Sequence, residues 1–222
     1  MQIMEMSLYM QEAVEITQIN AGANCYIITQ NESSILIDTG VKGFEEKILK
    51  QCEGKKIKLI VLTHGHIDHM QNAIFLAKKL QVPIAMNEKD IPLLENNLCR
   101  EMKSKGFVGN IVRFFSVLSA KSAKMENFEP EILLKESDNL KDFGIDAEII
   151  ELPGHTAGSI GVKAGKDSLF VGDALMHMTT AGPSLLFEEY DKMIESVRKV
   201  QDMGELKIYF GHGKMVYNRK WV

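Results

Sequence analysis

The fold of this chain is decided by Thr63-His64-Gly65-His66-Ile67-Asp68-His69. Three imidazoles and one carboxylate lie within six residues, directly after the apolar run 58–62, which predicts a buried strand. Burying these groups without a common partner would be costly, whereas a loop that leads from a strand into a helix can point them at one place. Imidazole and carboxylate ligands suit zinc, and they also suit iron or manganese. The segment therefore predicts a metal site at the end of a strand.

Three further candidate ligands lie beside glycines farther along the chain. His155 lies in Pro-Gly-His-Thr-Ala-Gly-Ser, Asp173 in Val-Gly-Asp-Ala and His212 in Phe-Gly-His-Gly. Each follows an apolar run that predicts a strand, so that the side chains can converge at one edge of a sheet. The adjoining glycines would let the backbone approach the site closely.

Apolar runs and turn residues set the expected order of elements. We expect strands over 14–17, 25–28, 34–37, 58–62, 83–86, 147–152, 159–163, 168–171 and 207–210, and helices over 44–52, 70–80 and 188–203. The stretch Asn20–Asn24 is expected to be a turn. This order predicts two layered halves around a core, in one domain over residues 1–222.

A helical insertion is expected at about residues 87–137, where convincing strand patterns are missing. Its large apolar residues recur at about helical spacing: Phe107, Ile111, Phe114, Phe115 and Leu118. We expect most of them to pack in the interior and a few to line a substrate pocket. A homodimer surface is the alternative.

Composition argues against several classes of function. The net charge of −4 provides no overall basic field for nucleic acid or anionic lipid. No window has the roughly 18 apolar residues needed to cross a membrane, and the first 16 residues do not resemble a signal peptide. Cys25, Cys52 and Cys99 share no metal-ligand spacing and are expected to be reduced thiols in a cytoplasmic protein.

The ordered motifs HxHxDH, GH, GD and GHG, between about residues 14 and 213, resemble those of the metallo-β-lactamase superfamily, including its glyoxalase II-like hydrolases. The resemblance implies an α/β fold, a four-layer αβ/βα sandwich, with two divalent metal ions at one edge. By position, the first ion would be held by His64, His66 and His155. The second would be held by Asp68, His69 and His212, and Asp173 would bridge the two.

Two further polar residues lie near these motifs. Ile37-Asp38-Thr39-Gly40 resembles the early Asp-Thr-Gly element of the family, in which Asp38 supports the site and is not a ligand. From the residues alone, turn stabilisation and support of a metal ligand are equally good interpretations of Asp38. His177, four residues beyond Asp173, either faces the substrate or is an ordinary surface residue.

The ligand set implies a reaction. Two ions about 3.5–4 Å apart would share a bridging hydroxide that attacks an electrophilic carbonyl or phosphorus. Asp68 would also act catalytically, by orienting the nucleophile or accepting a proton. We expect a metal-dependent hydrolase of a small-molecule ester, thioester or lactone-like bond, with zinc as the metal and iron or manganese as alternatives. The alternative functions are a mononuclear-iron oxidoreductase of the sulfur dioxygenase type, a phosphodiesterase and a metal-binding protein with vestigial activity.

Agreement with glyoxalase II itself is incomplete. That family usually has histidine where Gly65 stands, and it carries a C-terminal helical domain that helps to bind glutathione. Here only ten residues follow His212. The sequence therefore leaves the substrate open.

Overall fold

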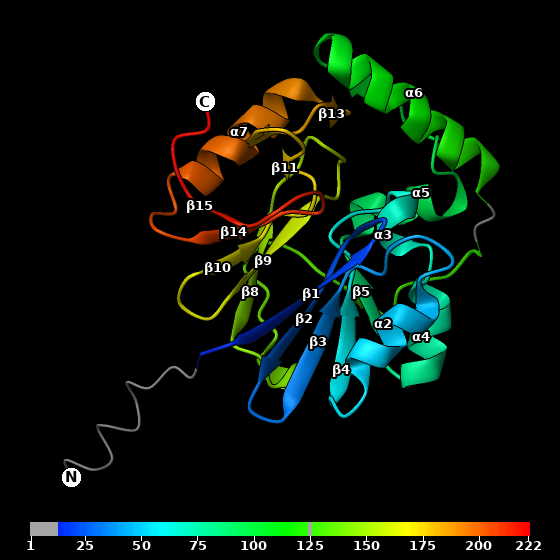
Figure 1. Cartoon of the computed structure of the whole chain (residues 1–222), viewed down its shortest axis with the longest axis vertical. Helices are drawn as coiled ribbons and strands as arrows, with labels where there is room; N and C mark the ends of the chain where they lie inside the picture. Colours follow the sequence, from blue (N-terminus) through cyan, green and yellow to red (C-terminus); the bar gives the residue numbers. More distant parts are fainter. Residues whose placement is uncertain (1–12, 124–125) are drawn as a thin grey trace.

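Two mixed β-sheets lie face to face in the computed structural model, which describes residues 13–123 and 126–222 (Figure 1). The first sheet has the order β1-β2-β3-β4-β5-β7, and the second has the order β15-β14-β10-β9-β8. The strands of the first sheet are β1 (Glu15–Ala21), β2 (Ala23–Gln30), β3 (Ser33–Ile37), β4 (Ile57–Val61), β5 (Ile84–Met86) and β7 (Ile132–Leu133). Those of the second are β8 (Ala147–Glu151), β9 (Ile160–Ala164), β10 (Ser168–Phe170), β14 (Lys207–Tyr209) and β15 (Val216–Tyr217).

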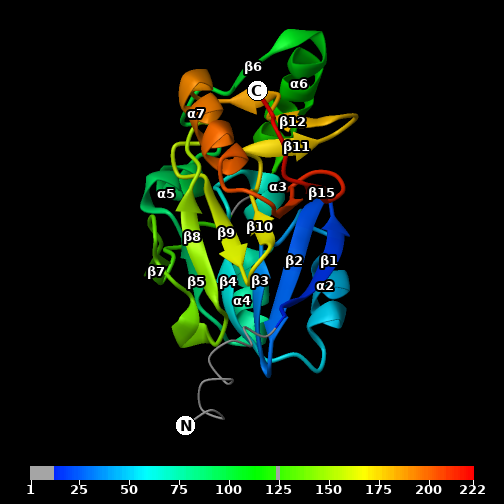
Figure 2. The same cartoon turned by 90° about the vertical axis from the view of Figure 1, so that its left-hand side faces the viewer.

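Helices cover the outer face of each sheet (Figures 1 and 2). On the first sheet lie α2 (Glu45–Cys52) and α4 (Ala73–Leu80), and on the second lies α7 (Tyr190–Gln201). The remaining elements are α3 (Ile67–Met70), the 3-10 helices η1 (Glu88–Asp90) and η2 (Lys141–Phe143), α5 (Ile91–Glu95), α6 (Gly106–Ser122), β6 (Lys103–Ser104), β11 (Leu175–His177), β12 (Ala181–Pro183) and β13 (Leu186–Phe187). The expected four-layer αβ/βα sandwich is confirmed.

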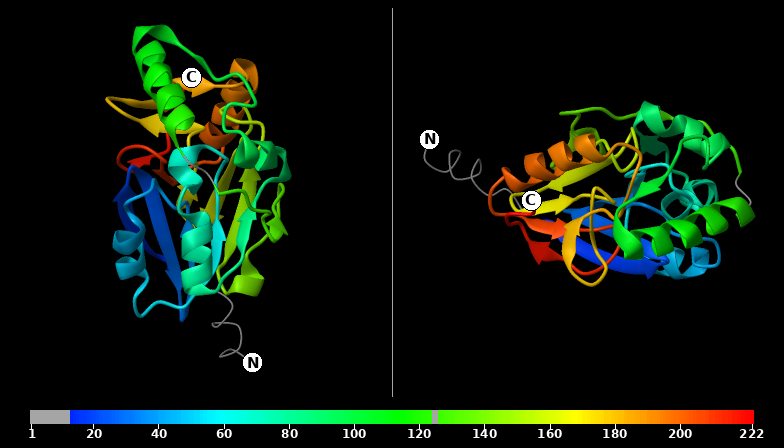
Figure 3. Two further views of the ribbon diagram at one scale, coloured as in Figure 1. Left: turned by 90° about the vertical axis from the view of Figure 1, so that its right-hand side faces the viewer. Right: turned by 90° about the horizontal axis from the view of Figure 1, so that it is seen from above.

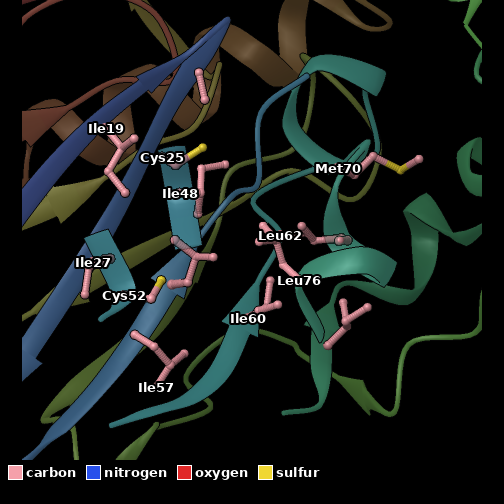
Figure 4. Close-up of a cluster of buried hydrophobic side chains, with 14 of the residues drawn as sticks. Ile19, Cys25, Ile27, Ile48, Cys52, Ile57, Ile60, Leu62, Met70 and Leu76 are labelled. Carbon is pink, nitrogen blue, oxygen red and sulfur yellow. The ribbon is translucent and has the colours of Figure 1, made fainter. Parts of the chain in front are cut away.

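Three separate apolar clusters join the four layers. Alternation along the central strands assigns their side chains, because successive residues of a strand point to opposite faces. In β2, Cys25 and Ile27 pack beneath α2 and α4, where Ile48 and Leu76 meet them (Figure 4). Their neighbours Tyr26 and Ile28 point the other way, into the cluster between the sheets. A third cluster packs the second sheet against α7. Each sheet is therefore buried on both faces.

The turn expected over Asn20–Asn24 is much tighter than predicted. Strands β1 and β2 run on to Ala21 and Ala23, and only Gly22, with a φ of 91°, turns the chain. The polar side chain of Asn24 is compatible with a buried strand because its amide donates to the carbonyls of Phe210 (3.0 Å) and Gly213 (2.8 Å). The prediction of a five-residue turn was wrong because the hydrogen-bond partners that allow Asn24 to lie in a strand are distant in sequence.

The helix expected over 70–80 is two helices. The first, α3, begins earlier, at Ile67, and α4 begins at Ala73. Between them, the buried amide of Asn72 donates to the carbonyls of Thr39 and Val41, at 2.9 and 2.7 Å. The break holds the turn at Thr39–Val41 against the start of α4.

The segment 87–137 differs from the prediction in two ways. It contains the short strands β6 and β7, and β7 extends the first sheet by pairing with β5. Its apolar residues are also mostly exposed: Phe107, Phe114 and Leu118 on α6 are 80%, 64% and 53% exposed. The expectation that most of them pack in the interior was wrong, because periodicity shows which residues share a helix face and not what covers it. Among the described residues, none of the helices combines the length and the hydrophobicity of a membrane span.

Candidate metal centre

The seven predicted ligands come together at one end of the two sheets. Four of them lie in the loop after β4 and in α3, which follow the first sheet: His64, His66, Asp68 and His69. The other three follow strands of the second sheet: His155 comes after β8, Asp173 after β10 and His212 after β14. The site is therefore built across the interface between the two sheets, from strand ends that the fold places side by side.

The donor atoms form three overlapping groups: His64, His66 and His155; His64, His69 and Asp173; Asp68, His69 and His212. Within each group the donor atoms lie within 4.8 Å of one another. The Nδ1 of His66 is 2.9 Å from the Nε2 of His155, and the Nε2 of His212 is 3.1 Å from the Oδ2 of Asp68. Asp173 lies between the groups, with one carboxylate oxygen 3.5 Å from the Nε2 of His69 and the other 3.4 Å from that of His212.

Three of these donor atoms are buried without a hydrogen-bond partner: the Nε2 atoms of His64 and His69 and the Oδ1 of Asp173. An unpaired buried polar atom costs about 1–3 kcal/mol, and native proteins contain few of them. A cation that accepts lone pairs from all three would remove this cost. The residues present therefore fit one or more divalent metal ions.

Hydrogen bonds outside the cluster fix the orientation of two of the imidazoles. The Nδ1 of His69 donates to Asp38 at 2.8 Å, and the Nδ1 of His155 donates to the carbonyl of Leu186 at 2.8 Å. In each ring this leaves the Nε2 to face the cluster. Such partners orient metal ligands and increase their basicity.

Asp38 is held in a strained conformation. Its φ of 57° lies in the left-handed region that non-glycine residues seldom adopt. The carboxylate is buried and also accepts from the backbone N–H and the hydroxyl of Thr63, each at 2.8 Å. One carboxylate thus connects the end of β4 to His69, a geometry that fits the supporting role rather than that of a ligand.

The electrostatics of the cluster favour ligation. Burial lowers the pKa of His64 and of His155, and it lowers that of His66 to about 3. These rings are therefore neutral near pH 7, which is the form that binds metal. Although burial opposes ionisation of Asp68 and Asp173, the neighbouring imidazoles hold the pKa of each below its usual value. Both carboxylates are thus ionised.

The imidazoles of His69 and His212 behave differently. Burial opposes their protonation, but the carboxylates around them, Asp173 foremost, raise the pKa of each ring. The protons that these rings hold would be displaced by a bound cation, so metal binding at this site is coupled to proton release.

The main functional residue that the sequence analysis missed is Asp90, at the end of η1. Its side chain is fully buried and accepts hydrogen bonds from both ligand-bearing loops. One oxygen accepts from the N–H of Gly65 (2.9 Å) and the hydroxyl of Thr156 (2.6 Å), and the other accepts from the N–H of Gly158 (2.8 Å). Gly65 separates His64 from His66, and Thr156 follows His155, so Asp90 fixes the spacing between the two loops.

Arg100 connects Asp90 to a second carboxylate, that of Glu188. Arg100 donates to Asp90 at 2.6 Å, and its Nε lies 2.9 Å from Glu188, which in turn accepts from the N–H of Ala157 at 2.9 Å. Burial raises the pKa of Glu188 to about 7, although the guanidinium of Arg100 opposes the shift. No local motif marks Asp90 or Arg100, because their partners are distant in sequence.

The loop that carries His212 is held from the first sheet. The N–H of Asn24 donates to the carbonyl of Gly211 at 2.7 Å, and the hydroxyl of Tyr26 donates to that of Phe210 at 2.7 Å. A Cβ atom at position 211 would collide with the Asp173 carboxylate and the His69 ring. Glycine is therefore required there by the close approach that the sequence predicted.

His177 lies apart from the cluster, at the end of β11. Its Nδ1 donates to the carbonyl of Lys214 at 2.7 Å, and its ring packs edge-on against Phe210. It is not among the residues that line the cavity above the cluster. This position favours a structural role for His177 in the loop that carries His212.

Comparisons with known proteins agree with this architecture. The family model of the Metallo-beta-lactamase superfamily matches residues 20–212. The hydroxyacylglutathione hydrolase GloC of Haemophilus influenzae is 32% identical over 208 residues, which are 90% of each chain.

Solved structures show the same fold. The B3 metallo-beta-lactamase BLEG-1 superposes with a TM-score of 0.69 at 18% identity, covering 91% of this chain and 94% of that one. TTHA1623 in a di-iron-bound form superposes with a TM-score of 0.65 at 21% identity, covering 94% of this chain and 100% of that one. At this level of identity the likeness establishes the fold and not the substrate.

Proposed function

The chain belongs to the metallo-β-lactamase superfamily, and from that premise we propose that it is a two-metal hydrolase of ester, thioester or lactone-like bonds. The observation that carries the proposal is the set of unpartnered buried donor atoms on His64, His69 and Asp173, around which the other ligands gather. The Haemophilus relative is named as a hydroxyacylglutathione hydrolase, which also supports a hydrolase function for this chain.

We assign the ligands to two sites that share Asp173. His64, His66 and His155 would hold one ion, and Asp68, His69 and His212 would hold the other. When bound, two divalent ions would supply a water of lowered pKa and an electrophilic centre for the substrate oxygen. Zinc suits this donor set, with iron or manganese as alternatives.

Asp68 is the residue of the seven best placed to handle a proton. Its side chain is the most exposed of the set at 35%, and it lies on the wall of the cavity above the cluster. Its carboxylate is ionised, and one oxygen is 3.1 Å from the Nε2 of His212. We propose that it orients the attacking water and accepts the proton released from it.

The test combines metal analysis with a substrate screen. Protein purified without added metal and then reconstituted with zinc should contain two equivalents and hydrolyse at least one thioester, ester or lactone. Asp173→Ala should lose metal and turnover together, whereas Asp142→Ala, at an exposed carboxylate of η2, should lose neither. One equivalent of iron with oxygen consumption would instead support the oxidoreductase alternative. Activity on phosphodiesters alone, or no turnover at all, would also refute the proposed reaction.

The compartment is a further part of the proposal. Cys25 and Cys52 are buried, Cys99 is exposed, and all three are free thiols. Unpaired thiols support a reducing environment, and we therefore propose that the hydrolase acts in the cytoplasm on a small molecule.

A further inference from the structure

A cavity of about 240 Å³ opens directly onto the metal-ligand cluster. Five of the seven ligands form one side of it. The remaining wall is mostly apolar, and its large side chains include Met102, Val112, Phe115, Met176, Met178 and Leu186. Any substrate that reaches the cluster through this cavity must therefore contact both the ligands and this apolar wall.

One face of α6 supplies much of that wall. Val112, Phe115, Ser116 and Ser119 line the cavity, and their spacing of three to four residues places them along one side of the helix. Helix α6 lies beyond the end of the sheets at which α3 and β11 are found (Figures 1 and 3). The helix thus lies on the opposite side of the cavity from the clustered residues and covers part of it.

Two apolar side chains of the cavity are left uncovered. Phe115 is 61% exposed, and Met178, on the β11–β12 turn, is 55% exposed. Covering such groups with an apolar ligand is favourable by about 25 cal/mol per Å² of apolar surface removed from water. Methionine also adapts its shape to different apolar ligands. Contact between these two side chains and a hydrocarbon group of the substrate would therefore favour binding.

The described residues that line this cavity include no lysine or arginine. Apart from the clustered histidines, its ionisable side chains are Asp68 and Asp173. The amide of Asn97 is already engaged, because it donates to the carbonyl of Gly65 and accepts from the N–H of Ile67 at 3.2 Å. A carboxylate on the substrate, other than at the reacting group, would be desolvated here without a cationic partner, which is costly.

We infer that the substrate carries an uncharged, apolar acyl or alkyl group, which lies against Phe115 and the cavity methionines while the scissile bond faces the ligand cluster. This inference rests on the proposed hydrolase function and specifies its substrate class. A glutathione thioester, whose thiol part carries two carboxylates, fits this cavity less well than a thioester of a neutral thiol.

The first experiment measures chain-length preference in the zinc-loaded enzyme. N-acetylcysteamine thioesters with acetyl, butanoyl and hexanoyl groups should show kcat/KM rising about two- to fourfold per methylene until the cavity is filled. The hexanoyl thioester of glutathione should be a poorer substrate than that of N-acetylcysteamine. A flat or falling dependence on chain length, or a preference for the glutathione thioester, would overturn the inference.

A matched pair of variants on α6 tests the assigned wall. Phe115→Ala should lower the ratio of hexanoyl to acetyl kcat/KM about tenfold, which is in the range expected for removing a large apolar contact. Phe107→Ala removes the same ring from the same helix but lies outside the cavity and is 80% exposed, so the ratio should not change. Equal effects of the two substitutions would contradict the assignment. Because both rings are exposed, neither substitution should shift the unfolding midpoint.

A binding measurement separates this inference from the proposed reaction. In protein labelled at the methionine methyl groups, 1-hexanol should shift the NMR signals of Met102, Met176 and Met178 more than ethanol does, with or without zinc. The signal of Met203, which packs against the cluster beneath α7, should stay in place. If these shifts occur but no thioester, ester or lactone is cleaved, the hydrolase proposal fails and the apolar cavity stands. If the three signals do not move, the inference about the cavity is wrong.

Discussion

The contact of Asp90 with both ligand-bearing loops makes a quantitative prediction for Asp90→Asn. The amide keeps the shape of the side chain, but one of its two ends becomes a donor. If the oxygen still faces Gly158 and Arg100, the NH2 group meets the N–H of Gly65, while the hydroxyl of Thr156 can rotate to accept. One buried backbone N–H is then left unpaired, at about 1–3 kcal/mol.

Loss of the charge on residue 90 adds a smaller contribution. Arg100 is 25% exposed and keeps its contact with Glu188, so the lost ion pair is worth about 1 kcal/mol after allowance for solvent. The expected loss of unfolding free energy is therefore about 2–4 kcal/mol. For a chain of 222 residues, this corresponds to a decrease of about 5–15 °C in Tm. Gly65 lies between the predicted ligands His64 and His66. Loss of its hydrogen bond to residue 90 should therefore also displace these imidazoles and lower zinc affinity about 10- to 100-fold.

The two effects require separate assays. Thermal unfolding of chelator-treated protein measures the change in stability without the metal, and competition with a chromophoric chelator measures zinc affinity. Asp142→Asn makes the same chemical change at an exposed site and should leave both values unchanged. If Asp90→Asn unfolds at the wild-type midpoint and binds zinc with wild-type affinity, Asp90 does not position the two loops.

Other substitutions test the remaining supports of the site and core. Asp38→Asn should weaken zinc binding about 10- to 100-fold in the same chelator competition, because it removes the carboxylate that orients His69; unchanged affinity would contradict this role. Gly211→Ala should abolish stoichiometric zinc binding, measured by metal analysis, since the added Cβ collides with Asp173 and His69; a variant with full metal content would show that the loop can move aside. Leu59→Ala, in the cluster between the sheets, should lower the unfolding free energy in urea by about 2–5 kcal/mol, and a smaller loss would indicate that the cavity collapses. Removal of zinc by a chelator should lower Tm, because binding contributes about 4 kcal/mol of unfolding free energy when free zinc is 1,000 times Kd; an unchanged Tm would mean that the ions do not stabilise the folded chain.

The sequence predicted that the seven residues would come together because each of them is marked by its immediate neighbours. His155, Asp173 and His212 each follow an apolar run and adjoin a glycine, so a local pattern places them at strand ends. The alternation in Cys25-Tyr26-Ile27-Ile28 likewise comes from the backbone geometry of a strand, in which each residue faces the opposite side from the next.

Features that depend on distant partners could not be predicted in this way. Asp90 looks like an ordinary helix-capping residue until the fold brings Gly65 and Gly158 to it. The exposure of Phe107 is also absent from the sequence pattern, since a periodic apolar face is the same whether protein, ligand or solvent covers it. Local patterns thus identified the seven clustered residues, while the residues that support and enclose the cluster could be found only from the tertiary structure.

The path of the chain between β5 and β7 has a consequence for protein engineering. Ala85 pairs with Ile132, so the two ends of this long excursion are fixed side by side in the first sheet. Its first part, up to Arg100, contacts the loops of the cluster through Asp90, whereas the part from residue 101 onward carries α6 and part of the wall of the cavity, including Met102 and Phe115. A graft that exchanges residues 101–131 for the equivalent segment of another member would keep the anchoring residues in place. The contribution of α6 to selectivity could then be moved between related proteins without changing the seven clustered residues.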